Sequence, residues 1–160
     1  MHPRLTRTVS VFLCLTLAAC GNVRSEAPSG ACRSTAASNR EVVLAFYQQG
    51  LIDHQLRNAF EHYMSADFVE HKPDVEAGTR EATIVYLEKL IKEVPDPNWE
   101  VVRTISEGDL VFLHAKFTPA PGAPAYAIAD IFRLDNCKIV EHWDVVGPPR
   151  EKQSNPHSRF

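Results

Sequence analysis

Residues 127–146, AIADIFRLDNCKIVEHWDVV, decide how the chain is expected to fold. They predict two β-strands joined by a turn at Asp135–Asn136, because apolar and polar residues alternate on both sides of that turn. The alternation places Asp130 on one face of the first strand together with Ile128, Phe132 and Leu134. A carboxylate on an apolar face is desolvated, paired or turned toward a cavity, so Asp130 is a candidate general base. The alternative is an edge-strand aspartate that faces solvent.

Upstream of this hairpin, the sequence predicts three helices and then further strands. A capping box at Ser38–Glu41 opens the first helix, Asp53 caps the second and Thr79 caps the third, which ends before Pro95. Beyond Pro97 the apolar period changes to two, which predicts strands over 99–106 and 110–118. Helices followed by a meander of strands indicate an α+β fold. We expect a curved antiparallel sheet wrapped around three N-terminal helices, forming a cone-shaped barrel with a pocket inside.

The first 37 residues are not expected to belong to this domain. Residues 1–19 have a basic start and a short apolar run, as an export signal does, and the run is too short to span a bilayer. The Leu-Ala-Ala that precedes Cys20 resembles a bacterial lipobox. The resemblance implies cleavage before Cys20, lipid attachment to its sulfur, and a protein anchored in the bacterial cell envelope on the periplasmic side of a membrane. An ordinary signal peptide or an uncleaved anchor is the alternative.

Composition then divides the chain into a tether, one domain and a tail. Residues 20–37 are rich in Ser, Ala, Gly and Pro and predict a flexible tether. Residues 38–149 form one domain, and residues 150–160 form a polar tail that is disordered or loosely laid on the surface.

Charge and cysteine usage limit the partners of the chain. The 17 basic and 20 acidic residues give −3, and loss of the signal leaves 15 against 20, or −5. With no basic patch visible, a nucleic-acid partner is not expected. Cys32 and Cys137 could form a disulfide in an exported protein or could both be free. They lack the paired spacing of a zinc site.

Four motifs resemble the SnoaL-like polyketide cyclase family of the nuclear transport factor 2-like superfamily. They are FVEHKP (68–73), EGDLVFLH (107–114), ADIFR (129–133) and KIVEHWDV (138–145). The resemblance covers nearly all of residues 38–149. It implies the cone-shaped α+β barrel and, for the best-known members, an intramolecular aldol condensation. By this match Asp130 is the acid/base residue, and no cofactor is expected.

The resemblance also implies further site residues. His71 and His114 fall on family positions that face the pocket, and with Asp130 they form the expected catalytic set. Contacts to a ligand are expected from Phe112, Phe132, His142 and Trp143. His114 could instead be a satisfied core residue and Trp143 a core residue or pocket wall, because periodicity alone does not say which face of the last strand looks inward.

Some residues depart from the family pattern or suggest a different site. Glu70 and Lys72 replace the usual Gln and Asn, which puts charge near the pocket mouth. His71 and His114 with Asp130 or Asp144 could form a metal site, but no HxH or HxxxH spacing supports it, so no metal is expected.

Two functions follow from these observations. One is a membrane-tethered enzyme that performs acid/base chemistry, of the aldol-condensation or isomerase type, on a carbonyl compound in an apolar pocket. The other is a non-catalytic lipoprotein that binds a small apolar ligand. A homodimer through the outer face of the sheet is expected in either case, with Trp99, Val101 and Phe117 as candidates for that face.

Overall fold

A computed structural model describes residues 33–150, 152 and 154–160. The predicted signal peptide, the lipidation site Cys20 and Cys32 lie outside the described residues. In chain order the elements are α1 (Ala36–Tyr47), a π-helix (Gln48–Ile52), α2 (Leu56–Tyr63), β1 (Met64–Glu70), a 3₁₀ turn (Glu76–Gly78), α3 (Arg80–Glu93), β2 (Asn98–Glu107), β3 (Leu110–Thr118), β4 (Tyr126–Asp135) and β5 (Lys138–Gly147).

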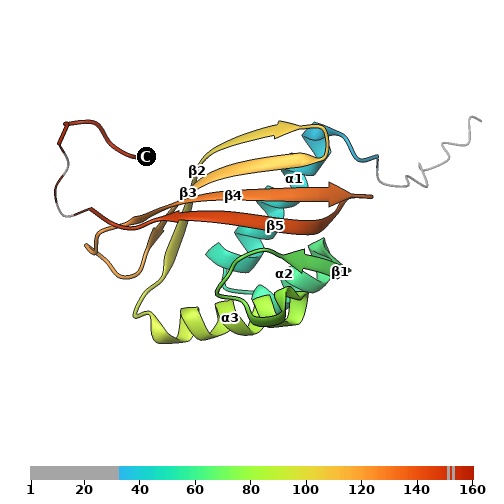
Figure 1. Ribbon diagram of the computed structural model, residues 1–160, viewed down its shortest axis with the longest axis horizontal. Helices are drawn as coiled ribbons and strands as arrows, with labels where there is room; N and C mark the ends of the chain where they lie inside the picture. Colours follow the sequence, from blue (N-terminus) through green and yellow to red (C-terminus); the bar gives the residue numbers. More distant parts are fainter. Residues whose placement is uncertain (1–32, 151, 153) are drawn as a thin grey trace, which may run out of the picture.

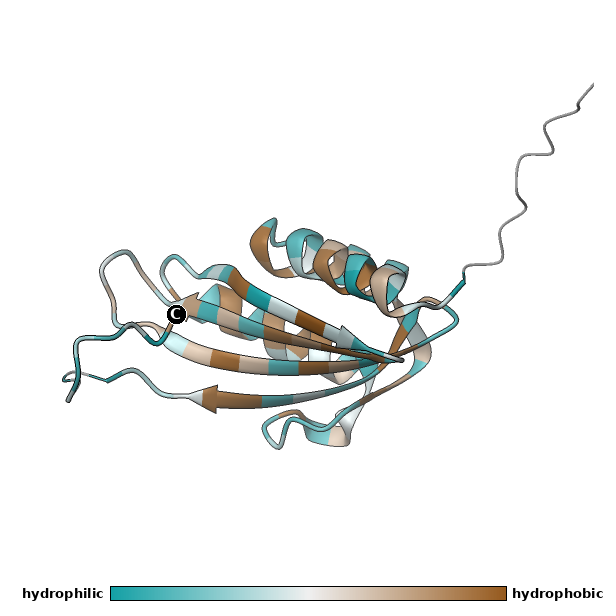
Figure 2. Ribbon diagram, turned by 90° about the horizontal axis from the view of Figure 1, so that it is seen from above, coloured by the Kyte–Doolittle hydropathy of each residue, from teal (hydrophilic) through white to brown (hydrophobic). Residues whose placement is uncertain are grey.

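The described strands form one sheet in the order β1-β5-β4-β3-β2. The pairs from β2 to β5 are antiparallel, and β1 joins the edge of β5 in parallel. Figures 1 and 2 show the sheet curving beside the helices. Helix α1 packs against β2 and β3, and α3 packs against α2 and β1. This is the predicted α+β cone, in which the helices of the described residues all lie on one side of the sheet.

Local sequence explains where the helices start and what the hairpin turn requires. The Thr35 side chain caps α1 and forms the capping box with Ser38, so the N-cap lies three residues before the predicted one. The predicted cap of α3, Thr79, accepts a hydrogen bond from the backbone N–H of Ala82. The turn between β4 and β5 places Asn136 and Cys137 at positive φ, 48° and 57°. Cys137 is disulfide-bonded.

The inner face of the sheet carries the apolar residues of the core. Trp99 and Phe117 pair across β2 and β3 and are only 5% and 8% exposed. The assignment of Trp99, Val101 and Phe117 to an outer dimer face is therefore wrong. Trp99 and Val101 on β2 pair with Phe117 and Ala115 on β3, and all four take inward-facing positions.

The outer face carries a different apolar row, which runs across four strands in register. Ile105 pairs with Phe112, Phe112 with Ile131, and Ile131 with Trp143. Ile105 is 65% exposed. At one side of this row the end of the tail folds back, and the Phe160 ring stacks 5.9 Å from the ring of His114.

Candidate active site

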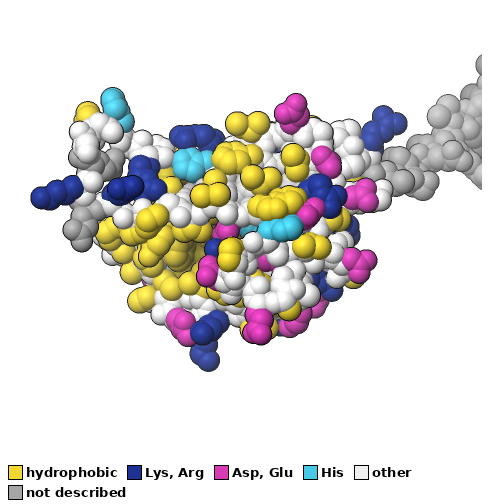
Figure 3. All heavy atoms as spheres, in the orientation of Figure 1, with side chains coloured by type: hydrophobic (Ala, Val, Ile, Leu, Met, Phe, Trp, Pro, Cys, Tyr) yellow, Lys and Arg dark blue, Asp and Glu magenta, His cyan; other side chains and the backbone are white. Residues whose placement is uncertain are grey.

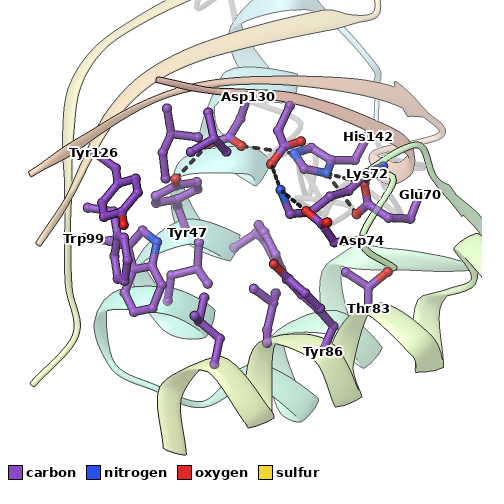
Figure 4. Close-up of a pocket in the computed structure, with 18 of the residues that line it drawn as sticks. Tyr47, Glu70, Lys72, Asp74, Thr83, Tyr86, Trp99, Tyr126, Asp130 and His142 are labelled. Carbon is purple, nitrogen blue, oxygen red and sulfur yellow. Dashed lines mark hydrogen bonds and ion pairs between the residues drawn. The ribbon is translucent and has the colours of Figure 1, made fainter. Parts of the chain in front are cut away.

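A cavity of about 380 Å³ lies between the inner face of the sheet and the helices. This is within the size range of small-molecule sites. Figure 4 shows aromatic side chains at one end and a group of charged side chains at the other. Figure 3 shows hydrophobic side chains gathered on the face of the molecule between the sheet and α3. The charged and hydroxyl-bearing lining residues are Tyr47, Glu70, Lys72, Asp74, Thr83, Tyr86, Tyr126, Asp130, His142 and Asp144.

Asp130 is the carboxylate at the centre of the charged group. The β4 alternation points it inward among apolar neighbours, and the residue is 5% exposed. The hydroxyl of Tyr47 donates to its Oδ2 at 2.7 Å, and Nε2 of His142 lies 3.1 Å from its Oδ1. Each oxygen of a carboxylate has two lone pairs, so Asp130 can still accept a hydrogen bond or a proton from a molecule in the cavity.

Tyr47 reaches Asp130 from the last position of α1, where the helix continues into the π-helical turn. Such turns are frequent at functional sites. Burial raises the pKa of Tyr47 well above its usual value, and the charge and hydrogen bond of Asp130 raise it further. The phenol therefore stays protonated and acts as a fixed donor to Asp130.

His142 connects Asp130 to a second buried carboxylate. Its Nδ1 lies 2.9 Å from both oxygens of Glu70, while Nε2 faces Asp130. Burial alone would lower the pKa of His142, but the hydrogen bonds and charges of Asp130 and Glu70 outweigh it and raise the pKa to about 9. At neutral pH the ring is an imidazolium with both N–H groups bound to carboxylates.

Lys72 forms a second ion pair at the same end of the cavity. Its ammonium lies 2.7 Å from Oδ2 of Asp144 and 3.6 Å from the more exposed Asp74. Burial alone would lower the pKa of Lys72, but the hydrogen bond and charge of Asp144 dominate and raise it. The ammonium also lies 6.0 Å from the centre of the Tyr86 ring. Both cations of the cavity are thus already engaged by acids of the chain.

Among the described residues, no group of three or more His, Cys, Asp or Glu side chains is placed to hold a metal. No helix within the described ranges is long and apolar enough to cross a membrane.

Residues 43–142 match the model of the SnoaL-like domain, which is more than half of the chain. The chain belongs to the SnoaL-like domain family. No curated protein matches the chain.

Solved structures similar to this SnoaL-like chain agree on the fold. TsrD from Streptomyces laurentii matches with a TM-score of 0.59 at 17% identity, over 71% of this chain and 91% of its own. AclR, a putative hydroxylase from Streptomyces galilaeus, matches with 0.59 at 22% over the same shares. A putative SnoaL-like polyketide cyclase from Jannaschia sp. CCS1 matches with 0.59 at 21%, over 73% and 91%. At these identities the likeness extends to the fold alone.

The structure places two of the predicted catalytic residues of the SnoaL-like domain outside the cavity. His114 lies on the outer face of β3, where Arg103 Nη1 donates to its Nδ1 at 2.8 Å. Partial burial lowers the pKa of His114, and the charges of Arg103 and Arg159 lower it further. His71 follows β1, stacks 4.7 Å from the Trp143 ring and bonds Glu141 at 2.8 Å. The expectation that these two histidines face the pocket is wrong.

Two of the predicted ligand contacts also lie outside the cavity. Phe112 and Trp143 belong to the outer row of the sheet, because their neighbours in sequence occupy the inward positions. Phe132 and His142 line the cavity, and their rings stack with centroids 4.6 Å apart. The two-histidine metal set does not form, since His71 and His114 lie on the opposite side of the sheet from Asp130.

Sequence reasoning missed Tyr47, considered Asp144 only as a possible metal ligand, and left Glu70 and Lys72 without a role. Glu70 and Lys72 had a visible signal, since they introduce charge where the family has amides. Tyr47 had none, because it lies among the apolar residues of a helix and its partner is 83 residues away.

Gly78 fixes the position of Glu70, and this yields a prediction. Gly78 has φ +57°, and a Cβ added there would lie 2.7 Å from the backbone oxygen of Glu70. We expect Gly78→Ala to cost about 1–3 kcal/mol for the strained backbone, plus the cost of displacing Glu70. Urea denaturation measures the loss.

Gly108 is the matched control, because its φ is +58° but nothing lies within 4 Å of the added Cβ. Gly108→Ala should show the backbone cost alone. Equal losses at the two positions would contradict a role for Gly78 in placing Glu70.

Proposed function

We propose that this SnoaL-like protein is an enzyme that removes a proton from carbon next to a carbonyl in a small, largely apolar compound. The observation that carries the proposal is Asp130, a buried carboxylate on the wall of an apolar cavity, held by the Tyr47 hydroxyl and the His142 ring. The binding of small molecules by the family and the putative cyclase and hydroxylase among the similar structures support this choice.

Asp130 would act as the base in this reaction. It takes the proton from carbon, the C–H electrons form the enolate, and the enolate then attacks a second carbonyl or is reprotonated at another carbon. His142 cannot take the proton, because both of its nitrogens already hold one at neutral pH. His142 and Glu70 instead keep the Asp130 carboxylate in place. The negative charge on the enolate oxygen needs a donor, and Lys72, whose ammonium has N–H groups beyond the one bound to Asp144, lines the same cavity.

Deuterium exchange tests the proposal without knowledge of the natural substrate. Phenylacetone in D₂O should exchange its carbon-bound protons faster with the protein than without it, as followed by NMR. Exchange equal to the rate of the buffer alone for a series of apolar ketones would argue for the second function.

The second function is a non-catalytic binding protein for a small apolar ligand. It is favoured by the cavity wall opposite the charged group, where Trp99, Phe117 and Tyr126 pack together with ring centres 4.6 and 5.8 Å apart. A wall of this kind binds ring systems whether or not chemistry follows.

Attachment to a membrane through Cys20 remains a proposal of the sequence. Leu17–Gly21 after a basic and apolar start motivates it. Cys20→Ser should move the protein from the membrane pellet to the soluble fraction, because the lipid would have no sulfur to join. A serine variant that still sediments with membranes would refute the lipid anchor.

A homodimer also remains a proposal, now through the outer row of the sheet. Ile105, Phe112, Ile131 and Trp143 supply an apolar strip on the face that carries no helix. Light scattering at micromolar concentration should give the mass of two chains, and Ile105→Glu should give the mass of one. A wild-type protein of single-chain mass would remove the proposal.

A further inference from the structure

The charged end of the cavity holds more buried acids than buried cations. The side chains of Glu70, Asp130 and Asp144 are 2%, 8% and 10% exposed, against 16% for Lys72 and 13% for His142. With His142 as an imidazolium, three carboxylates face two cations, and Asp74 adds a further negative charge at the exposed rim. The negative potential is also felt by Tyr47, whose pKa is raised in part by the charges of Asp130 and Asp144.

Both cations are already paired with acids of the chain. An imidazolium has two N–H groups, and both are bound, one to Glu70 and one to Asp130. The ammonium of Lys72 is held between Asp144 and Asp74. A carboxylate entering this end would add a further negative charge beside three buried acids that only two cations balance, which is unfavourable.

Acceptors, in contrast, are available. Lys72 binds Oδ2 of Asp144, and within the described residues no hydrogen bond ends on the other oxygen, Oδ1. The Asp144 side chain is about nine-tenths buried and lines the cavity beside Asp130, its direct partner across β4 and β5. Oδ1 of Asp144 is not among the fully buried unpaired atoms of the described residues, so it is open to the cavity and gains from any N–H or O–H that reaches it, most of all from a charged one.

The rest of the cavity suits the body of such a molecule. Tyr86 lies beside the charged group, and the rings of Trp99 and Tyr126 form the opposite wall (Figure 4). The Phe117 ring packs against both of them. Aromatic faces attract cations as well as apolar groups. No lining residue among those described adds a free positive charge to balance the acids.

We propose that the cavity selects compounds with an apolar or aromatic body and a hydrogen-bond-donating head that is cationic or uncharged, an amine above all, and that it rejects carboxylates. The inference rests on the proposed use of this cavity as the substrate site. The substrate is then a carbonyl compound that carries an amine or hydroxyl group and no acid.

Three naphthalene probes that differ only in their heads test the inference by isothermal titration calorimetry at neutral pH. Naphthylethylamine should bind most tightly, naphthylethanol next, and naphthylacetate weakest by about tenfold or more, since like charges brought together in a site are strongly unfavourable. A carboxylate that binds as tightly as the amine would overturn the inference.

Two variants should move this selectivity in opposite directions. Asp144→Asn removes the open carboxylate, so the preference for the amine over the carboxylate should shrink. Lys72→Met removes a cation, so the preference should grow. Glu100→Gln, on the outer face of β2, is the matched control and should leave the preference unchanged. Should either variant fail to fold, the other variant and the wild-type series still decide.

The binding series separates this inference from the proposed chemistry. If the protein shows no preference for the amine but still catalyses ketone exchange, the inferred substrate class is wrong and the proposed enzyme activity stands. If the protein prefers the amine but catalyses no exchange on any ketone, the inferred ligand class stands and the proposed enzyme activity is wrong.

Discussion

Asp130→Asn is expected to lower carbonyl turnover by about 10²–10⁴-fold, which is the usual contribution of a positioned base. Asparagine keeps the shape of aspartate and can still accept a hydrogen bond from Tyr47, but it cannot take a proton from carbon. We expect the domain to stay folded, because His142 keeps its contact with Glu70, but to lose about 1–3 kcal/mol of stability, because Nε2–H of His142 loses the carboxylate oxygen that accepts from it. The rate is measured as deuterium incorporation into phenylacetone, and stability as the midpoint of urea unfolding.

Asp67→Asn provides the control for this experiment. It makes the same chemical change at an exposed position of β1 that does not line the cavity. The control variant should exchange protons like the wild type. If Asp130→Asn also matches the wild type while the wild type is active, Asp130 is a structural residue and the base lies elsewhere.

The fold could be predicted because its signals are local. Helical spacing, caps and a change of period to two are visible within short windows, and they located α1, α3 and β2–β5. The parallel pairing of β1 with β5 could not be predicted, because it joins segments about 70 residues apart. No local pattern in either segment indicates which residues pair.

The faces of β5 show why the site was only half predicted. Strict alternation puts Ile139, Glu141 and Trp143 on one side, yet Ile139 is fully buried while Glu141 and Trp143 face outward. A register shift between Arg133 and Leu134 in the β4–β5 pair accounts for the change. Such a bulge adds a residue to one strand and reverses the side on which later residues lie. The same shift brings His142 and Asp144 into the cavity.

His114 was misplaced for a simpler reason. The residues at 111, 113 and 115 are all apolar, as are those at 110 and 112, so both faces of the strand appeared able to face a core. In the structure Val111, Leu113 and Ala115 are fully buried, so their face of the strand is the inner one and His114 faces outward. An inward His114 would have turned these three toward solvent, at about 25 cal/mol for each Å² of apolar surface.

The second large effect concerns stability and pH, and it depends on His142. Its pKa is about 9 in the folded protein, against a reference value of 6.5. A raised pKa contributes stability that is fully present below the unfolded value and is lost as the pH rises through the folded value. We therefore expect the free energy of unfolding to fall by about 3 kcal/mol between the unfolded and folded pKa values, since each pKa unit corresponds to about 1.4 kcal/mol.

His142→Gln should remove that dependence, because glutamine does not titrate. At near-neutral pH the variant should also be less stable than the wild type by about 3–5 kcal/mol, since Glu70 and Asp130 lose the cation between them and remain buried. Urea unfolding across the range measures both effects, with His62→Gln, an exposed histidine on α2, as the control that should behave like the wild type. A wild-type stability that stays level through this range would mean that the His142 ring is neutral in the folded protein. In that case His142, not Asp130 alone, would be able to accept the proton from carbon.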